Sequence, residues 1–313
     1  MVHRRTVSLV PPLPVLLLGA GFVRRCHSFT GAVVPAHPTP KEPPTLSSSI
    51  GFSFTPGGLL FPYHLGVAKC LEMERYLASD TPLAGSSAGA LAAAVVGCGL
   101  SIDTASQLSG LVFEDCRTGG TAFRLKEVVK RGLEGALPND AHKIINNRKG
   151  AITVGITELF PKPKGVFISH FETRDDLIEV LLGSCHVPFW FSARPYMQVR
   201  GKATMDGFFS VPKEQFGAPD IPTADEVVRV TVFPTTSIQV KSEKPGDLIS
   251  PDLLDRYKSG RFMELLKYAL NPADEGVLEE LFNAGFESGE VGFSGGLQIL
   301  YCLLMTSRPE ASW

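Results

Sequence analysis

The sequence of 313 residues lacks several features that would assign it to a functional class at once. None of its six cysteines belongs to a Cys-x-x-Cys pair, so the zinc and redox motifs built on that spacing are excluded. No His, Asp and Glu residues cluster with the spacing of metal ligands, so we predict no metal ion and no other cofactor. The apolar stretch Leu13–Val23 is about half as long as the roughly 20 residues that a membrane-spanning helix requires.

Acidic residues are missing from the first 41 positions, which hold five basic residues. The rest of the chain therefore carries 25 basic and 32 acidic residues, a poor match for a phosphate backbone, and we predict no nucleic-acid partner. A basic segment without acids is typical of a transit peptide or a signal peptide. We expect an organelle (plastid first, mitochondrion second) or the secretory pathway after cleavage; a tail that is never cleaved is the alternative.

Five prolines between positions 35 and 44, followed by serines, indicate an extended linker. We therefore predict a targeting segment and linker over residues 1–47 and one folded domain over residues 48–313. Within that domain predicted strands alternate with predicted helices, which favours an α/β fold with a mainly parallel sheet. The predicted strands are Ser49–Phe54, Pro82–Ala84, Ala151–Leu159, Val166–Phe171 and Val227–Phe233. One predicted helix starts at Pro62, and the others cover Ala90–Val96, 103–114, 121–135 and Asp175–Leu182.

The pentapeptide Gly85-Ser86-Ser87-Ala88-Gly89 lies between a predicted strand and an Ala-rich predicted helix. In such a Gly-x-Ser-x-Gly elbow the serine sits on a sharp turn above the sheet, and the helix N-terminus supplies amide donors and a positive dipole end. Ser87 is therefore our candidate nucleophile, with Gly85 and Gly89 as the glycines of the elbow. The same string recurs at 292–296, but no clear strand leads into it. We interpret Ser294 as a loop serine before a helix at Leu297–Met305.

Histidine is absent from the last 127 residues, where the Ser-Asp-His order of common hydrolases would place the catalytic histidine. His142, His170 and His186 remain candidates, although none has a recognisable catalytic context. The other candidate base is Asp206, in the single Asp-Gly dipeptide of the chain, after the strand-like residues Met197–Arg200. A carboxylate there can take the serine proton directly, which would make a two-residue site, whereas a plain turn aspartate is the alternative.

The loop Thr55-Pro56-Gly57-Gly58-Leu59 joins a predicted strand to a predicted helix, a place where consecutive amides can converge on an oxyanion. Together with the elbow and the Asp-Gly pair, this loop resembles the patatin-like phospholipases, especially their adiponutrin-type branch. The resemblance runs from about Ile50 to Val211. It includes the segments Tyr63-His64-Leu65-Gly66 and Cys185-His186-Val187-Pro188-Phe189.

The resemblance implies a three-layer α/β/α sandwich, no metal, a catalytic dyad of Ser87 and Asp206, and an oxyanion hole formed by backbone amides. Those amides belong to Gly57, Gly58 and Leu59. The chain departs from the family pattern at four positions, which are Pro56, Leu60, Phe61 and Phe208. Because proline has no amide to donate, the oxyanion hole must rely on Gly57 onward.

A lipid substrate requires an apolar channel, and the resemblance places the run Phe189-Trp190-Phe191 near the mouth of the site; ordinary core packing is the alternative. The basic amphipathic segment 121–135 can lie on anionic lipid or form a solvated face. We expect a glycerolipid substrate at a membrane or lipid-droplet surface, with peripheral membrane contact. The sequence does not identify a protein partner.

The leading hypothesis is a serine esterase that cleaves carboxylic esters of glycerolipids (phospholipid, galactolipid or acylglycerol) through an acyl-enzyme on Ser87. An acyltransferase that uses the same serine is one alternative. A catalytically weak or inactive lipid-binding or lipid-surface protein is another, and the variant loop at Pro56 and Phe61 motivates it.

Overall fold

The computed structural model describes residues 49–240, 242–244, 246–257, 261–292 and 294. The predicted targeting segment and linker, as well as the predicted helix Leu297–Met305, lie outside the described residues. The domain boundary near residue 48 therefore stays a prediction.

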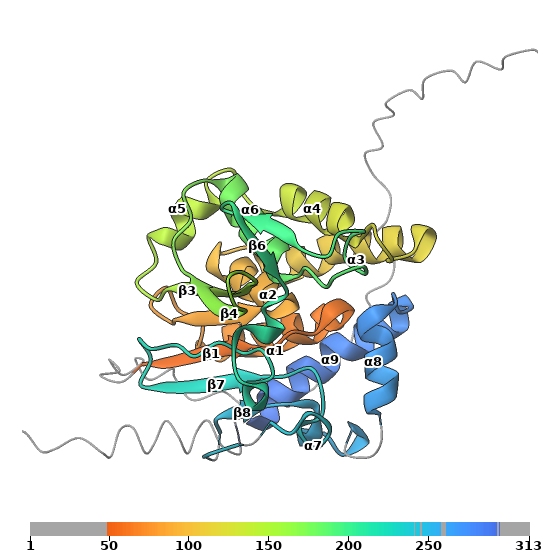
Figure 1. The fold of residues 1–313 in the computed structure, drawn as a ribbon. Helices are drawn as coiled ribbons and strands as arrows, with labels where there is room; N and C mark the ends of the chain where they lie inside the picture. Colours follow the sequence, from red (N-terminus) through yellow and green to blue (C-terminus); the bar gives the residue numbers. More distant parts are fainter. Residues whose placement is uncertain (1–48, 241, 245, 258–260, 293, 295–313) are drawn as a thin grey trace, which may run out of the picture. The chain divides into compact units, whose positions relative to one another are not determined.

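The described residues form one mixed sheet whose centre is parallel (Figure 1). The parallel strands follow the order β3-β2-β1-β7-β8, and β4, β6 and β5 extend the β3 side through antiparallel pairs. The strands are β1 Ile50–Phe54, β2 Leu83–Ser86, β3 Ile152–Glu158, β4 Lys164–Ile168, β5 Met197–Val199, β6 Lys202–Met205, β7 Glu226–Val230 and β8 Leu248–Ile249.

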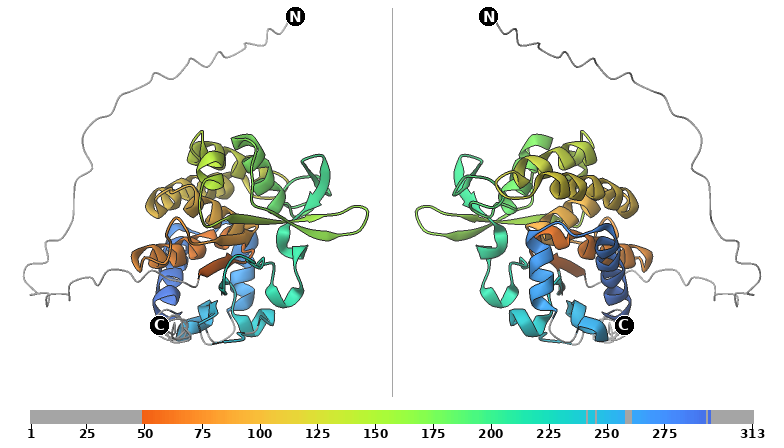
Figure 2. Two further views of the ribbon diagram at one scale, coloured as in Figure 1. Left: turned by 90° about the vertical axis from the view of Figure 1, so that its left-hand side faces the viewer. Right: turned by 90° about the vertical axis from the view of Figure 1, so that its right-hand side faces the viewer.

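Helices flank this sheet, which confirms the predicted α/β class with a mainly parallel sheet (Figures 1 and 2). They are α1 Phe61–Met73, α2 Ala88–Gly97, α3 Ile102–Gly119, α4 Leu125–Ala136, α5 Ala141–Asn146, α6 Arg174–Ser184, α7 Thr235–Ile238, α8 Phe262–Leu270 and α9 Glu275–Gly292. Short 3-10 helices cover Gly58–Leu60, Gly207–Ser210, Lys213–Gln215, Pro251–Leu253 and Asp255–Tyr257.

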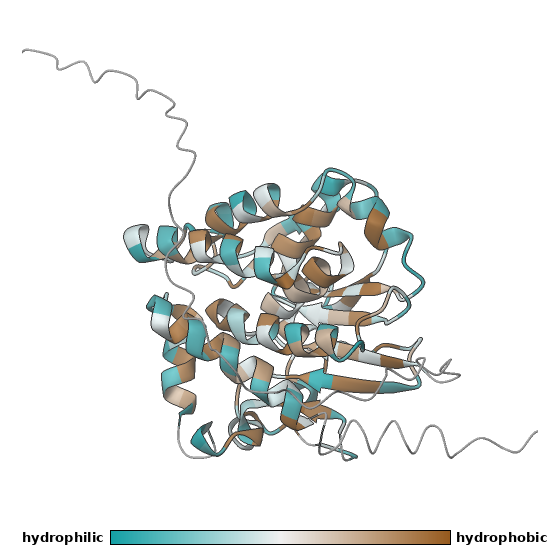
Figure 3. Cartoon of the chain, turned by 180° about the vertical axis from the view of Figure 1, so that it is seen from behind, coloured by the Kyte–Doolittle hydropathy of each residue, from teal (hydrophilic) through white to brown (hydrophobic). Residues whose placement is uncertain are grey.

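The hydrophobic residues lie where the layers meet. The strands are mostly hydrophobic, whereas most helices alternate between hydrophobic and hydrophilic residues, as expected for one buried and one exposed face (Figure 3). The Ala-rich α2 is the exception, because it is buried nearly all round and packs on β1, β2 and β3. No helix among the described residues is both long and apolar enough to cross a bilayer.

The helix α9, which the sequence analysis did not predict, packs closely on α1. A Cβ on Gly66 of α1 would overlap the Phe282 carbonyl group, and a Cβ on Gly285 of α9 would overlap the Tyr63 carbonyl group. The two backbones therefore approach to a distance that only glycine permits. This contact holds α1, and with it the loop that precedes α1, against the C-terminal part of the described chain.

Two other predicted elements differ in detail from the structure. The predicted helix over 121–135 begins only at Leu125, because Phe123 has a φ of 65°, outside the helical region. The predicted strand Val166–Phe171 is β4, which forms an antiparallel hairpin with β3 rather than a further parallel strand. This hairpin extends away from the rest of the domain (Figure 2).

Candidate active site

Ser87 occupies the turn between β2 and α2, at the edge where the parallel strands β1 and β2 both end. Its φ of 55° and ψ of −128° are strained for a residue that carries a Cβ. A strained turn between strand and helix is the geometry of a nucleophile elbow, in which the surrounding packing holds the serine in place.

The two glycines of the elbow are required by close backbone contacts. A Cβ on Gly85 would overlap the backbone of Gly89, and a Cβ on Gly89 would overlap the carbonyl group of Phe54 at the end of β1. Any larger side chain would push α2 away from the sheet. The spacing Gly-x-Ser-x-Gly therefore fixes the position of Ser87.

Ser184, which the sequence analysis did not single out, ties the elbow to the sheet. The Ser87 amide donates to Ser184 Oγ over 2.8 Å, and the Ser184 hydroxyl donates to the Gly155 carbonyl of β3 over 2.7 Å. A serine at the end of a helix carries no motif, so only the fold identifies this role.

Asp206 reaches the elbow through an antiparallel hairpin. Ser86 pairs with Gly155 of β3, and Met205 of β6 pairs with Thr157 on the other side of β3. Because Asp206 directly follows Met205, the register of β3 brings it beside the elbow. The sequence analysis recognised the strand β5 upstream but missed β6, which sets this register.

Three hydrogen bonds hold Asp206. Its amide donates to the His186 carbonyl, its carbonyl accepts from the Thr157 hydroxyl, and its Oδ1 accepts from the Phe208 amide, each over 2.8 Å. Its Oδ2 is buried and makes no hydrogen bond of normal geometry. One carboxylate oxygen thus fixes the side chain, and the other is available for proton transfer.

Ser87, Asp206 and Cys185 form one buried cluster. Burial raises the pKa of Asp206 to about 6, while the Phe208 amide and the Ser87 hydroxyl oppose part of that rise. Burial also raises the pKa of the Cys185 thiol, with the charge of Asp206 raising it further and the Ser87 hydroxyl opposing it. A carboxylate with a pKa near 6 is ionised at neutral pH and still able to accept a proton during a reaction.

The glycine loop lies at the same edge of the sheet. Gly58 has a φ of 55°, and a Cβ there would overlap the Ala269 carbonyl oxygen, so only glycine fits. Gly58 and Leu59 line the cavity into which Ser87 opens. Within the described residues, the amides of Gly57 and Gly58 donate no hydrogen bond to the protein, which leaves them available to an oxyanion.

His64 anchors the start of this loop. Its Nε2 lies 2.8 Å from the Thr55 carbonyl oxygen, and its Nδ1 is buried without a partner. Because burial lowers the pKa of His64 to about 4, the ring is neutral, and Nε2 carries the proton that is donated to Thr55.

The departures from the family pattern are part of the packing around the site. A Cβ on Gly217 would lie 2.6 Å from two ring carbons of Pro56 and 3.0 Å from the Phe208 Cα, so these two variant residues meet at one glycine. Leu60 is fully buried, and Phe61 lines the cavity.

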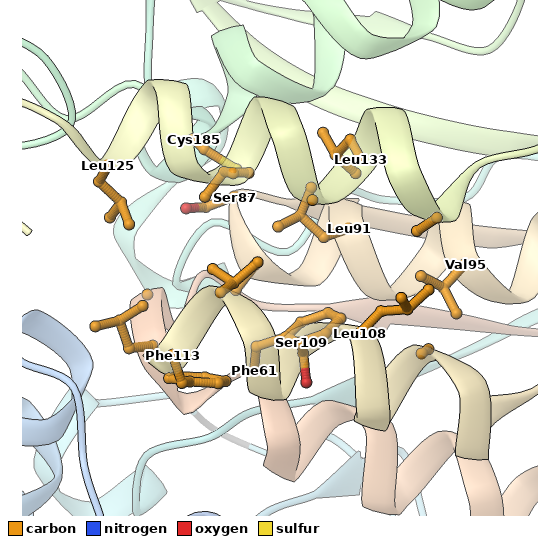
Figure 4. A pocket seen from close by; sticks show the side chains of 18 of the residues that line it. Phe61, Ser87, Leu91, Val95, Leu108, Ser109, Phe113, Leu125, Leu133 and Cys185 are labelled. Atoms are coloured by element: carbon orange, nitrogen blue, oxygen red, sulfur yellow. The ribbon is translucent and has the colours of Figure 1, made fainter. Parts of the chain in front are cut away.

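An apolar cavity extends from Ser87 between α2, α3 and α4 (Figure 4). Its volume is about 110 Å³. Most of its wall is aliphatic and includes Leu91, Val95, Leu108, Val112, Leu125 and Leu133. The polarity of this wall fits an apolar ligand.

Two of the three predicted channel residues, Trp190 and Phe191, line this cavity. Phe189, the third, is not part of the wall, and 60% of it is exposed. Phe123 lies beside them, because its amide donates to the Trp190 carbonyl over 2.8 Å, and 59% of it is exposed. The aromatic run therefore divides into a wall and an exposed rim.

The competing candidates lie elsewhere. None of His142, His170 and His186 lines the cavity among the described residues; the His186 ring contacts the Arg194 carbonyl instead, over 3.1 Å. Ser294 follows α9, and its hydroxyl donates to the Glu290 carbonyl, so a helix and not a strand precedes it. No group of three or more His, Cys, Asp or Glu side chains in the described part of the chain is arranged to hold a metal ion.

Residues 53–216 match the family model described as patatin-like phospholipase. Human patatin-like phospholipase domain-containing protein 5 is 32% identical over 204 residues, which are 62% of this chain and 44% of that protein. Mouse 1-acylglycerol-3-phosphate O-acyltransferase Pnpla3 is 28% identical over 246 residues, which are 75% of this chain and 56% of that protein. Human patatin-like phospholipase domain-containing protein 4 is 27% identical over 252 residues, which are 76% of this chain and 94% of that protein.

This chain thus spans about half the length of the first two of these relatives. Among solved structures, VipD from Legionella pneumophila aligns with a TM-score of 0.44 and 11% identity, over 79% of this chain and 67% of that chain. The family model covers half of this chain, and the curated relatives are those expected for the adiponutrin-type branch. The chain belongs to the patatin-like phospholipase family.

Proposed function

We propose that this protein hydrolyses carboxylic esters of glycerolipids, with Ser87 as nucleophile and Asp206 as its base. The observation that carries the proposal is one arrangement. A strained serine and a buried carboxylate with a free oxygen meet at the end of an apolar cavity.

In the proposed reaction Ser87 Oγ attacks the ester carbonyl carbon while Asp206 Oδ2 takes its proton. The negative charge on the carbonyl oxygen is stabilised by amides of the glycine loop, chiefly those of Gly57, Gly58 and Leu59. The alcohol leaves with the proton from Asp206. Asp206 then deprotonates a water molecule, which attacks the acyl-enzyme; as the fatty acid leaves, Asp206 returns the proton to Ser87 Oγ.

The exposed rim suggests how the site meets its substrate. Phe123 and Phe189 lie next to the cavity wall and leave more than half of each residue in solvent. Both have a positive φ, of 65° and 59°, which L side chains rarely adopt. We propose that the rim contacts the surface of a membrane or lipid droplet. The cations near the rim contribute less: Arg124, just before α4, and Arg131 of α4 pair with Asp115, and Lys130 pairs with Glu134.

The direct test is fatty-acid release from mixed glycerolipid vesicles by the full chain, with EDTA present. We expect release by the parent, and a loss of about a thousandfold or more in Ser87→Ala and Asp206→Asn. Full activity in folded Ser87→Ala would refute the proposal. The lipid that is consumed identifies the head group.

A second function uses the same acyl-enzyme and is favoured by one relative, whose name describes an O-acyltransferase. If an added lysophospholipid acceptor takes the acyl chain faster than water does, this protein is a transferase. An inert lipid-binding protein is distinguished from both enzymes by a fluorophosphonate, which labels only an activated serine.

A further inference from the structure

The cavity described above follows the axes of three helices. On α2 its wall contains Ser87, Leu91 and Val95, four residues apart in each step, which is one stripe along the helix. The stripe on α3 runs from Phe113 back to Ala105, and that on α4 from Leu125 to Ala136. The nucleophile is at one end of all three stripes, because Phe113 and Leu125 lie near Ser87, whereas Leu108 and Leu133 lie toward Val95 (Figure 4).

The far end of the cavity is closed by packed side chains. Val95 and Ala105 belong to a second hydrophobic cluster with Leu65, Ala68 and Ile102, all of them buried. The wall continues past Val95 to Leu100, which is half-buried and packs against this cluster, so a chain that enters at Ser87 meets these side chains at the far end. The cavity has a definite length.

That length follows from helix geometry. At about 1.5 Å per residue, the stripes on α2 and α3 are each about 12 Å long and the stripe on α4 about 16 Å. An extended hydrocarbon chain with bonds of about 1.5 Å advances by about 1.3 Å per carbon, so this length accommodates about 10 to 12 carbons. From these observations, and on the basis of the proposed function, we infer that the protein selects esters of medium-length straight acyl chains and that Val95, Ala105 and Ala136 set the upper limit.

Two substitutions shorten the cavity at different depths. Leu91 is one helical turn from Ser87, about 6 Å along α2, so Leu91→Trp leaves room for about four or five carbons. Ala136→Phe fills only the far end. Leu111→Trp is the matched control, because Leu111 is on α3 but is 69% exposed and outside the wall.

The experiment compares kcat/KM for p-nitrophenyl butyrate, decanoate and palmitate. Decanoate has six more methylenes than butyrate, and each methylene that is buried raises kcat/KM by up to about fourfold. In the parent we therefore expect kcat/KM for decanoate to exceed that for butyrate by about tenfold or more, with no further gain for palmitate. Leu91→Trp loses at least about tenfold of the decanoate-to-butyrate ratio. Ala136→Phe moves the optimum below decanoate, and Leu111→Trp matches the parent. A parent ratio retained in folded Leu91→Trp, or a palmitate rate well above decanoate, would overturn the inference.

A binding measurement separates this inference from the proposed chemistry. Trp190 is in the cavity wall, and Trp313→Phe leaves it as the single tryptophan of the chain. In Ser87→Ala with Trp313→Phe, we expect the fluorescence of Trp190 to report fatty-alcohol affinity that rises from butanol to decanol and levels off before hexadecanol. If no ester is hydrolysed but this limit is observed, the proposed function is wrong and the length limit stands. Affinity that keeps rising to hexadecanol contradicts the limit, whatever the esters show.

Discussion

The carboxyl group of Asp206 combines two demands that oppose each other. Burial keeps Oδ2 free of other donors, and the same burial raises the pKa to about 6, above the ordinary value of 3.8. Because the proposed base must be ionised, we expect kcat/KM to rise with pH along a limb whose midpoint is near 6. A pH profile with a soluble short-chain ester measures it. A limb near 4 would mean that Asp206 is solvated or is not the base.

The same shift predicts a stability effect. The folded state holds a proton on Asp206 up to about pH 6, and the unfolded state only up to about 3.8, so folding loses stability as pH rises between these values. The difference corresponds to about 3 kcal/mol at pH 7. Asp206→Asn carries no such charge and can keep the bond from the Phe208 amide. We expect it to be inactive and more stable than the parent above pH 6, with the difference vanishing toward pH 4. Urea unfolding across this pH range tests the trend.

Gly58 is the residue of the loop with the least freedom to change. An alanine there would need a φ of 55° and would overlap the Ala269 carbonyl oxygen. We expect Gly58→Ala to unfold more easily by about 2 kcal/mol or more and to lose activity. Gly57→Ala is the matched control, since Gly57 has an ordinary φ of −153° and its new Cβ would meet side chains alone, Val232 at 2.9 Å and His64 Nε2 at 3.6 Å. Equal urea midpoints for the two variants would contradict this account.

At the residue scale the sequence predicted what short motifs encode and missed what long-range contacts create. The elbow around Ser87 was found because glycine is the only residue that fits at Gly85 and Gly89. Ser184 and Thr157 hold the site through single hydrogen bonds, which leave no pattern along the chain. The run Phe189-Trp190-Phe191 is predicted as one unit near the mouth, but the positive φ of Phe189 turns the chain there, so Phe189 lies on the rim and not in the wall.

At the scale of elements, the α1–α9 contact decides how firmly the loop before α1 is held. Gly285 faces the Tyr63 carbonyl group, so Gly285→Ala forces the helices apart. We expect a loss of about 1–3 kcal/mol. Gly276→Ala, on the same helix but with no atom near its new Cβ, should instead stabilise the protein by up to about 1 kcal/mol. Thermal melting of both variants measures the contrast, and two equal shifts would refute the proposed packing.

The missed elements share a physical cause. The helix α9 contains Gly285, Gly289 and Gly292, which lower its intrinsic helix propensity, and its stability comes from packing on α1. The strand β6 has only four residues, too few for a periodic signal, yet it carries Asp206 to the elbow. The strands β1 and β3 were predicted because hydrophobic residues alternate along them with Gly, Ser or Thr.

At the scale of the whole molecule, the proposed contact with a lipid surface requires one face of the protein to dock on it. The exposed large hydrophobic residues occur in separate places, so exposure alone does not select a docking face. Phe160 and Phe167 belong to the β3–β4 hairpin and are 66% and 48% exposed, comparable with the rim. What distinguishes Phe123 and Phe189 is their position next to Trp190 and Phe191, at the part of the cavity where the ester reaches Ser87 in the proposed reaction.

We therefore expect the double variant Phe123→Ser with Phe189→Ser to bind phosphatidylcholine vesicles about tenfold or more weakly, because two aromatic side chains no longer enter the apolar layer. Phe160→Ser with Phe167→Ser removes a matched pair and should bind as the parent does. Co-sedimentation with vesicles measures both, and thermal melting checks that each variant is folded. If the hairpin pair loses binding and the rim pair does not, the hairpin is the docking element, and substrate must travel from it to the Ser87 end of the cavity.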